Sequence, residues 1–243
     1  MTTRIALLPL IVLFTLQQMT SFAQQDPKTQ ELLKQDWACL KCFADSNAKV
    51  PPPAPGENRV VFMGNSITIG WLHLNPEFFA GKPYLDRGIG GQTTPQMLIR
   101  FRPDVIDLKP KVVVILAGTN DIAGNTGYTS NETIFGNIVS MVELARASGI
   151  RVVISSILPA YEYPWRTGMD PLHRIPELNS RLKTYAEANH VVYLDYFSAM
   201  VDIRGGLRQE LTSDGVHPTR AGYLVMGPLA EKAIAEALKM KIK

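Results

Sequence analysis

The chain has 243 residues, of which 46% are hydrophobic and 19% are charged, an ordinary mixture for a globular protein. Its formal net charge is only +3 and no basic block stands out, so the composition argues against binding to nucleic acid or to an anionic membrane surface. The length suits one α/β domain with a sizeable core.

Residues 1–23 are predicted to be a cleavable export signal. Arg4 supplies a positive charge, and the apolar run IALLPLIVLF is well short of the roughly 20 residues that span a bilayer. Small residues at Ser21 and Ala23 predict a cut after Ala23, with an uncleaved anchor as the alternative. No later segment is long and apolar enough to be transmembrane. We therefore expect a periplasmic or secreted protein with no stable membrane insertion after cleavage.

Residues 24–57 are expected to form an N-terminal helix and a proline-rich connector. Apolar residues recur there at helical spacing, at Leu33, Trp37, Leu40 and Ala44. The run PPPAPGEN that follows favours an extended polyproline segment. The connector is too short to separate two independent domains, so we expect the helix to pack on the body that follows.

The two cysteines, Cys39 and Cys42, have the C-x-x-C spacing of redox and metal sites. Phe43 follows where attachment of a c-type haem needs histidine, and no second cluster of Cys or His completes a zinc site. An oxidising compartment permits a disulfide. We therefore favour a local structural disulfide or two free thiols over a redox role, and we expect no metal.

Short apolar strands alternate with helical stretches from residue 58 to residue 243. Strands are predicted in RVVFMG, YLDRGIGG, KVVVILAG, RVVISSILP and HVVYLDY. Helices are predicted over about 131–147, with a capping box at Thr129 and Glu132, over 175–189, and over 219–240, with a break or kink at Pro228. This alternation predicts a parallel sheet of five strands covered by helices on both faces.

Glycine-rich or small polar turns follow the first three predicted strands. They are Gly64-Asn65-Ser66, residues 88–94 and residues 118–121. Because functional sites in such sheets form at the carboxyl ends of the strands, we expect these turns to converge on one rim.

A serine nucleophile needs a histidine base, and the base needs an orienting group. The chain has four histidines. His190 opens a strand at the wrong edge, His173 lies in a proline-rich loop, and His73 lies in the helix after the first strand. His217 follows Asp214 by three residues, which places both on one side of a tight turn. The alternative is that Asp214 and His217 only cap the final helix.

Ester hydrolysis also needs donors for the oxyanion. The backbone N–H of Ser66 at a helix start, the N–H of Gly91 and the side-chain amide of Asn120 can each serve. Each also has a plainer interpretation, as a capping residue, a turn glycine and a turn asparagine.

The stretches FMGNSITIGW, DRGIGGQTT, LAGTND and SDGVHPT resemble the four sequence blocks of the SGNH (GDSL-like) hydrolases, in the family's order and spacing. The resemblance covers about residues 58–238. It implies a three-layer α/β/α sandwich of flavodoxin-like type and serine ester hydrolysis without cofactor or metal. The GIGG and GTND runs look most like the platelet-activating-factor acetylhydrolase-like branch.

The resemblance assigns Ser66 as nucleophile, His217 as base and Asp214 as its orienter, with Ser66, Gly91 and Asn120 as oxyanion donors. Two departures stand out. The family usually has Asp before the serine, where this chain has Asn65. The G-x-S-x-G elbow of the α/β-hydrolases is also missing around the serine, which argues against lipases of that fold.

The substrate is less clearly indicated. Tyr161, Trp165 and Arg166 lie in a loop that either stacks on a sugar or packs down on its own aromatics. Export and the lack of a hydrophobic lid favour short acyl groups, with an O-acetyl ester on a carbohydrate as the first hypothesis. The alternatives are a lysophospholipase, a broad short-chain esterase or thioesterase, or a non-catalytic glycan-binding protein. The sequence does not indicate an oligomeric state.

Overall fold

The structure is a computed structural model that describes residue 31 and residues 34–241, so the expected signal peptide and its cleavage site lie outside the described residues. Contacts divide the chain into two units, Met1–Trp37 and Ala38–Lys243. The sheet and the candidate site belong to the second unit.

The long N-terminal helix is a wrong prediction for the described residues. Residues 34–43 form turns and irregular backbone; among the described residues before β1, Glu31 and α3 (Ala44–Ala48) are helical. Cys39 has a φ of 55°, outside the range of a right-handed helix, and it is joined to Cys42 in a disulfide. Of the two thiol states left open by the spacing, the structure contains the disulfide.

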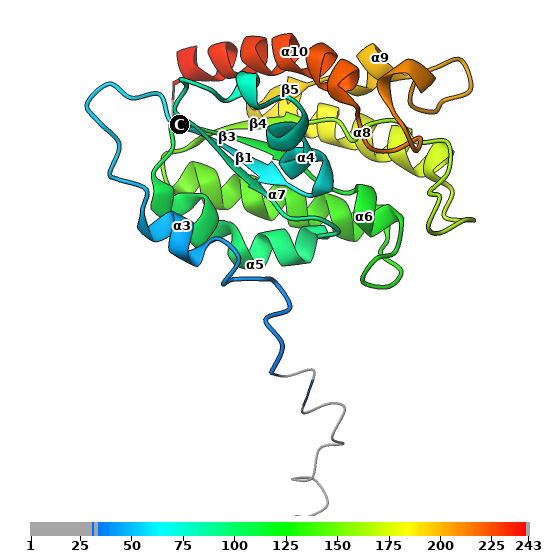
Figure 1. Cartoon of the computed structure of the whole chain (residues 1–243), viewed down its shortest axis with the longest axis horizontal. Helices are drawn as coiled ribbons and strands as arrows, with labels where there is room; N and C mark the ends of the chain where they lie inside the picture. The colour runs from blue at the N-terminus through cyan, green and yellow to red at the C-terminus, as the bar shows by residue number, and fades with distance from the viewer. Residues whose placement is uncertain (1–30, 32–33, 242–243) are drawn as a thin grey trace, which may run out of the picture. The chain divides into compact units, whose positions relative to one another are not determined.

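Five parallel strands form one sheet in the order β2-β1-β3-β4-β5, which confirms the predicted fold class (Figure 1). Their bounds are β1 (Val60–Gly64), β2 (Tyr84–Gly88), β3 (Val112–Leu116), β4 (Arg151–Ser155) and β5 (Val192–Leu194). Gly64 pairs with both Gly88 and Leu116, so the first three strands end side by side. The chain order reverses at β1, and such switch points are where α/β sheets place their ligands.

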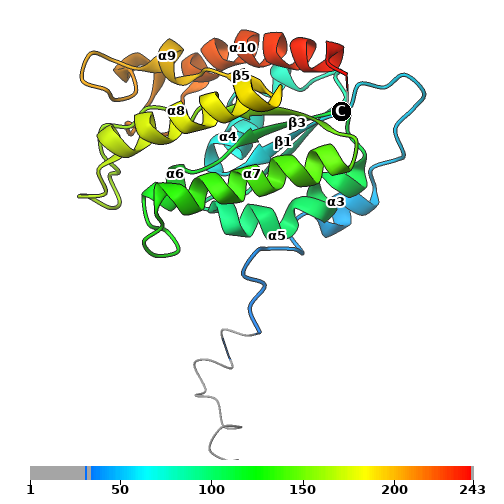
Figure 2. The ribbon, with the colours of Figure 1, turned by 180° about the vertical axis from the view of Figure 1, so that it is seen from behind.

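Helices cover both faces of the sheet, as Figures 1 and 2 show from opposite sides. One face carries α4 (Ser66–Leu74), α9 (Phe197–Met200) and α10 (Arg220–Lys239). The other carries α5 (Thr94–Asp104), α7 (Asn131–Ala147) and α8 (Pro171–Asn189). The remaining short elements are α6 (Thr119–Ile122), η1 (Pro76–Phe78), η2 (Ile106–Leu108) and η3 (Gln209–Leu211).

Alternate residues of β1 explain why both faces need cover. Val61 and Met63 pack in the cluster under α5, α7 and α8, whereas Val60 and Phe62 pack in the cluster under α4 and α10. A strand that is buried on both faces in this way has a continuous apolar sequence.

Among the described residues, none of the helices has the length and apolarity needed to cross a bilayer.

Two helix starts, and the interior of α10, differ from the sequence prediction. The predicted capping box of Thr129 and Glu132 is wrong, because Ser130 is the N-cap of α7 and its Oγ accepts the N–H of Thr133 at 3.2 Å. α8 begins at Pro171, earlier than expected. α10 continues through Pro228 as one helix, since the packing of its buried face on the sheet outweighs the lost hydrogen bond.

Candidate active site

Ser66 is the first residue of α4 and follows β1 after a single linking residue, Asn65. The side chain of Asn65 is the N-cap, and its Oδ1 accepts the N–H of Ile67 at 3.0 Å. Asp and Asn serve about equally well as N-caps. The departure from the family's usual aspartate therefore keeps the local turn and removes only a charge.

Two glycines let α4 lie against the strand ends. A Cβ on Gly64 would lie 1.9 Å from Oγ1 of Thr68, and a Cβ on Gly88 would lie 2.3 Å from the backbone nitrogen of Ile69. Because both distances are far shorter than any real Cβ contact, a side chain at either position would push the helix away. These glycines therefore set the position of Ser66.

The opposite side of α4 is anchored to α10. Tyr223 of α10 donates its hydroxyl to the carbonyl of Ile67 at 2.8 Å. Trp71 stacks on Tyr223 and on Phe78, with ring centroids 5.5 Å and 4.3 Å apart. The first turn of α4, which carries the serine, is thus held from the strands and from the neighbouring helix.

Asp214 and His217 lie in the turn before α10. Oδ1 of Asp214 accepts the backbone N–H of Val216 at 2.9 Å and that of His217 at 2.7 Å. Thr212 closes the turn by donating its hydroxyl to the carbonyl of His217 at 2.7 Å. The N-cap of α10 is Thr219, so Asp214 does not cap that helix.

Ser66, His217 and Asp214 form one hydrogen-bonded row. Oγ of Ser66 lies 2.9 Å from Nε2 of His217, and Nδ1 of His217 lies 2.7 Å from Oδ2 of Asp214. The row is reached from solvent, because the His217 and Asp214 side chains are 36% and 38% exposed. Partial burial raises the pKa of Asp214, but the hydrogen bonds from His217 and Val216 outweigh it and hold this pKa below its usual value. Asp214 is therefore ionised and able to stabilise a protonated imidazole.

Asn120 and Gly91 lie at the ends of the two strands that flank β1. Asn120 is in α6, is 3% exposed, and donates one amide hydrogen to the backbone carbonyl of Gln92 at 2.9 Å. Its second amide hydrogen is available to a ligand. Gly91 has a φ of 76°, which glycine adopts without strain.

Asp121 ties these two strand ends together. Its carboxylate accepts the backbone N–H of Thr94 at 3.0 Å and the hydroxyl of Thr94 at 2.6 Å. Burial raises the pKa of Asp121 to about 6, although the bonds from Thr94 lower it in part. The loop that carries Gly91 is thereby fixed to the turn that carries Asn120.

Of the loop after β4, only some of the predicted substrate residues lie near Ser66, His217 and Asp214. The ring of Trp165 lies 5.9 Å from the ring of His217 and is 45% exposed. Arg166 donates to the carbonyl of Gly124 at 3.0 Å, and the ring of Tyr161 lies against Arg204. Of the three predicted substrate residues, Trp165 thus contacts the triad.

Three polar residues near the site were not singled out from the sequence. Asn125 accepts the indole N–H of Trp165 at 3.3 Å and donates to the carbonyl of Gly91 at 3.1 Å. Gln92 and Arg100 are buried behind the same loop. Gln92 stands inside the quoted GIGGQTT block, but no spacing in the sequence indicates what its side chain meets.

Comparison with known proteins agrees with the geometry. Residues 62–225 match the model of the GDSL-like Lipase/Acylhydrolase family. The chain belongs to this family of ester hydrolases. The bovine platelet-activating factor acetylhydrolase IB subunit alpha1 is 30% identical over 77% of this chain and 77% of its own length. This confirms the family resemblance drawn from the sequence blocks.

Two solved structures are more similar still. A candidate acylhydrolase from Bacteroides fragilis NCTC 9343 is 50% identical, with a TM-score of 0.83 over 85% of this chain and 100% of its own. A GDSL-like lipase from Bacteroides thetaiotaomicron VPI-5482 is 47% identical, with a TM-score of 0.81 over 83% of this chain and 100% of its own. The GDSL-like fold is thus shared over nearly the whole second unit.

Proposed function

We propose that this GDSL-like hydrolase cleaves short-chain esters through a Ser66–His217–Asp214 triad and an acyl-enzyme. The observation that carries the proposal is the 2.9 Å contact between Oγ of Ser66 and Nε2 of His217, whose other nitrogen is held by Asp214. Oγ attacks the ester carbonyl while His217 accepts its proton. The resulting imidazolium is stabilised by the Asp214 carboxylate. A glycan-binding protein without activity has no need of this row.

The oxyanion of the tetrahedral intermediate is assigned to three donors: the backbone N–H groups of Ser66 and Gly91 and the amide of Asn120. The N–H of Ser66 is free for this role because the first N–H groups of a helix have no intrahelical acceptor. The intermediate collapses when His217 returns the proton to the departing alcohol. Water then attacks acyl-Ser66 while His217 takes its proton, and His217 returns this proton to Oγ of Ser66 as the acid is released.

Replacing the nucleophile tests the reaction class. Ser66→Ala should abolish hydrolysis of p-nitrophenyl acetate, and a fluorophosphonate should label wild type at Ser66. Equal turnover by wild type and Ser66→Ala, or labelling at another residue, would refute the triad. A wild type with no turnover on any ester would refute the hydrolase activity itself.

We further propose that the substrate is an O-acetyl ester on a carbohydrate. Trp165 supports this, because its exposed indole beside His217, with its N–H held by Asn125, offers a flat apolar surface for a sugar ring. The name of the bovine relative, an acetylhydrolase, agrees with a short acyl group. The second candidate function is that of a lysophospholipase, or of a broad short-chain esterase or thioesterase.

A release screen discriminates these substrates. Acetate release from acetylated polysaccharides should exceed hydrolysis of lysophospholipids and acyl-thioesters in kcat/KM. Trp165→Ala should then raise KM for the glycan about 3- to 10-fold, the value of one aromatic contact. Tyr161→Ala is the matched control, since that ring contacts Arg204. Equal effects of the two variants would contradict the stacking role of Trp165.

We also propose that the mature protein is secreted or periplasmic, with its signal removed after Ala23. Small residues at Ser21 and Ala23 support this cut. N-terminal sequencing of protein recovered outside the cytoplasm should begin at Gln24. An intact N-terminus on exported protein would favour the uncleaved anchor.

A further inference from the structure

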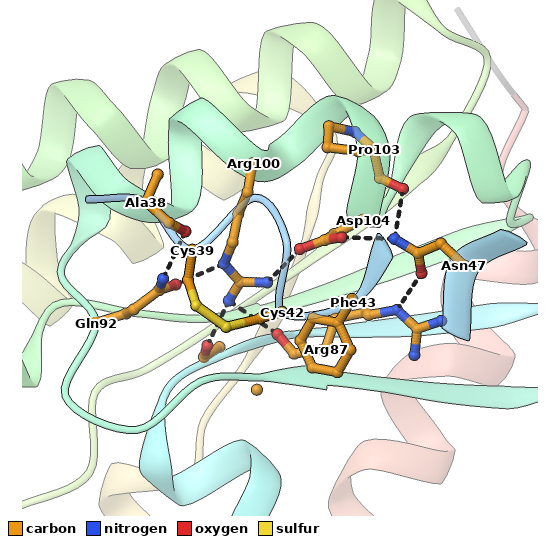
Figure 3. A network of polar contacts seen from close by, with 12 residues as sticks. Ala38, Cys39, Cys42, Phe43, Asn47, Arg87, Gln92, Arg100, Pro103 and Asp104 are labelled. Carbon is orange, nitrogen blue, oxygen red and sulfur yellow. Dashed lines mark hydrogen bonds and ion pairs between the residues drawn. A yellow bond between two sulfur atoms is a disulfide. The ribbon is translucent and has the colours of Figure 1, made fainter. Parts of the chain in front are cut away.

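A short segment that the catalytic assignment does not use lies over the loop of Gly91. We call residues 38–48 the N-terminal strap. It contains the Cys39–Cys42 disulfide and α3, and Figure 3 shows it against Gln92, Arg87 and Arg100. The ring of Phe43 covers both guanidinium groups, 4.8 Å from that of Arg87 and 5.9 Å from that of Arg100.

Gln92 is the point where the strap meets the oxyanion loop. Its side chain is held at both ends: Nε2 donates to the carbonyl of Ala38 at 2.9 Å, and Oε1 accepts from Nε of Arg100 at 2.5 Å. Its backbone carbonyl accepts the amide of Asn120 at 2.9 Å. Gln92 therefore directly follows one oxyanion donor of the proposed function, Gly91, and bonds a second, Asn120.

Arg100 provides a rigid base for this contact. It is fully buried, and Nη2 donates to the carbonyls of Gly64 and Arg87 at 2.9 Å each, while Nη1 contacts Asp104 at 2.9 Å. One guanidinium thus joins the end of β1, the end of β2 and the side chain of Gln92 (Figure 3). Asn47 of the strap completes the cluster by bonding Asp104 at 2.7 Å.

The consequence concerns the direction of the Asn120 amide. One of its hydrogens is committed to the Gln92 carbonyl, so the orientation of that carbonyl sets where the second hydrogen points. The N–H of the same peptide, that of Thr93, donates to Oε1 of Gln96 at 3.0 Å, and the two bonds of the Gln92 side chain hold the peptide from its other side. We propose that Gln92 is a positioning residue of the oxyanion hole, clamped between Arg100 and the Ala38 carbonyl so that its own carbonyl aims Asn120 at the substrate.

This inference rests on the proposed function, since it concerns the donors of that reaction. A purely structural role for Gln92 is the competing explanation, because a buried amide with satisfied bonds also stabilises the fold. Asn179 offers a matched control. It is similarly buried, and its amide bonds the N–H and the carbonyl of Ile157 at 2.8 Å and 2.9 Å.

The kinetic test compares Gln92→Met, which keeps the length but loses both bonds, with Asn179→Leu. On p-nitrophenyl acetate, Gln92→Met should lower kcat about 10- to 100-fold with little change in KM, less than the full loss of one oxyanion donor. Asn179→Leu should lower Tm but leave kcat within about 2-fold. An equal fall in kcat for both variants would overturn the positioning role.

A double-mutant cycle supplies the sharper readout. In an Asn120→Ala background, Gln92→Met should cost less than about 3-fold, because the donor that it orients is gone. Additive losses would overturn the proposal.

A measurement independent of turnover separates this inference from the proposed reaction. The side-chain amide resonances of Asn120, assigned by their loss in Asn120→Ala, should shift in Gln92→Met and remain in place in Asn179→Leu. Unshifted resonances in Gln92→Met would overturn the positioning role. Absence of Ser66-dependent turnover in wild type would refute the reaction, while the resonances still decide what Gln92 holds.

Discussion

Asp214→Asn should impair catalysis more than Asp214→Ala, because the turn dictates which way an asparagine amide points. Oδ1 of Asp214 accepts the N–H groups of Val216 and His217, at 2.9 Å and 2.7 Å. An asparagine keeps both bonds only if its oxygen takes the place of Oδ1. Its NH2 group then faces Nδ1 of His217, in the position of Oδ2. The ring is thereby held with its proton on Nε2, the nitrogen that must accept the proton of Ser66.

The two variants therefore differ in magnitude. A histidine locked in the wrong tautomer lowers kcat by about 10⁴ in Ser-His-Asp enzymes. Alanine removes the two backbone bonds that hold the turn and one charge-assisted bond to the imidazole. The bond to the imidazole is worth about 1.5–3 kcal/mol, or about 10- to 150-fold in rate. Because Asp214 and His217 are 38% and 36% exposed, water can replace the lost acceptor and leave the useful tautomer accessible.

The assay is the initial rate of p-nitrophenyl acetate hydrolysis, with kcat and KM determined for both variants and for wild type. His217→Ala sets the lower limit, with a loss of several orders of magnitude. An alanine variant slower than the asparagine variant would refute the tautomer reasoning. If both variants stayed within about 3-fold of wild type, Asp214 would have no orienting role.

Two further predictions concern stability near the strand ends. Burial raises the pKa of Asp86 from 3.8 to about 6. Because this pKa is higher in the folded state, wild type should lose up to about 3 kcal/mol of unfolding free energy as the pH rises from about 4 to 6. Asp86→Asn should lack this loss in urea unfolding between pH 4 and 8, and a pH-independent difference from wild type would contradict it. Gly88→Ala should lower the unfolding free energy by about 2 kcal/mol or more, because its Cβ would lie 2.3 Å from the nitrogen of Ile69. Gly90→Ala, with nothing within 4 Å, should have little effect, and equal losses would refute the packing explanation.

The sheet was predictable because its signal is local and strong. A strand buried on both faces is typically a continuous apolar run, as β1 and β3 are. All five predicted runs contain a strand of the structure, including β2, which carries Asp86 and Arg87. The N-terminal helix failed for an equally physical reason. Helical spacing at Leu33, Trp37, Leu40 and Ala44 does not reveal that Cys39 has a φ of 55°, a conformation outside the right-handed helix, or that it is joined to Cys42.

The candidate triad was predictable from the sequence blocks and from the rule that sites lie at strand ends, but spacing alone would not have chosen it. Asp170 and His173 have the same separation as Asp214 and His217, and they also bond, at 2.6 Å. His173 is 85% exposed in the first turn of α8, whereas His217 reaches Ser66. The SDGVHPT block and the position of His217 beside Ser66 distinguish the two pairs, whereas the three-residue spacing does not.

Gln92 shows where sequence reasoning ends at this site. Its neighbours in the sequence indicate a turn, and the turn does exist, but the partners of its side chain are Ala38 and Arg100, 54 and 8 residues away. Contacts of a polar side chain with distant parts of the chain leave no periodic pattern in the sequence. A buried amide can find its donor and its acceptor anywhere in the fold. The candidate catalytic groups can therefore be named from motifs, while the contacts of Gln92 that the proposed positioning role uses need a structure.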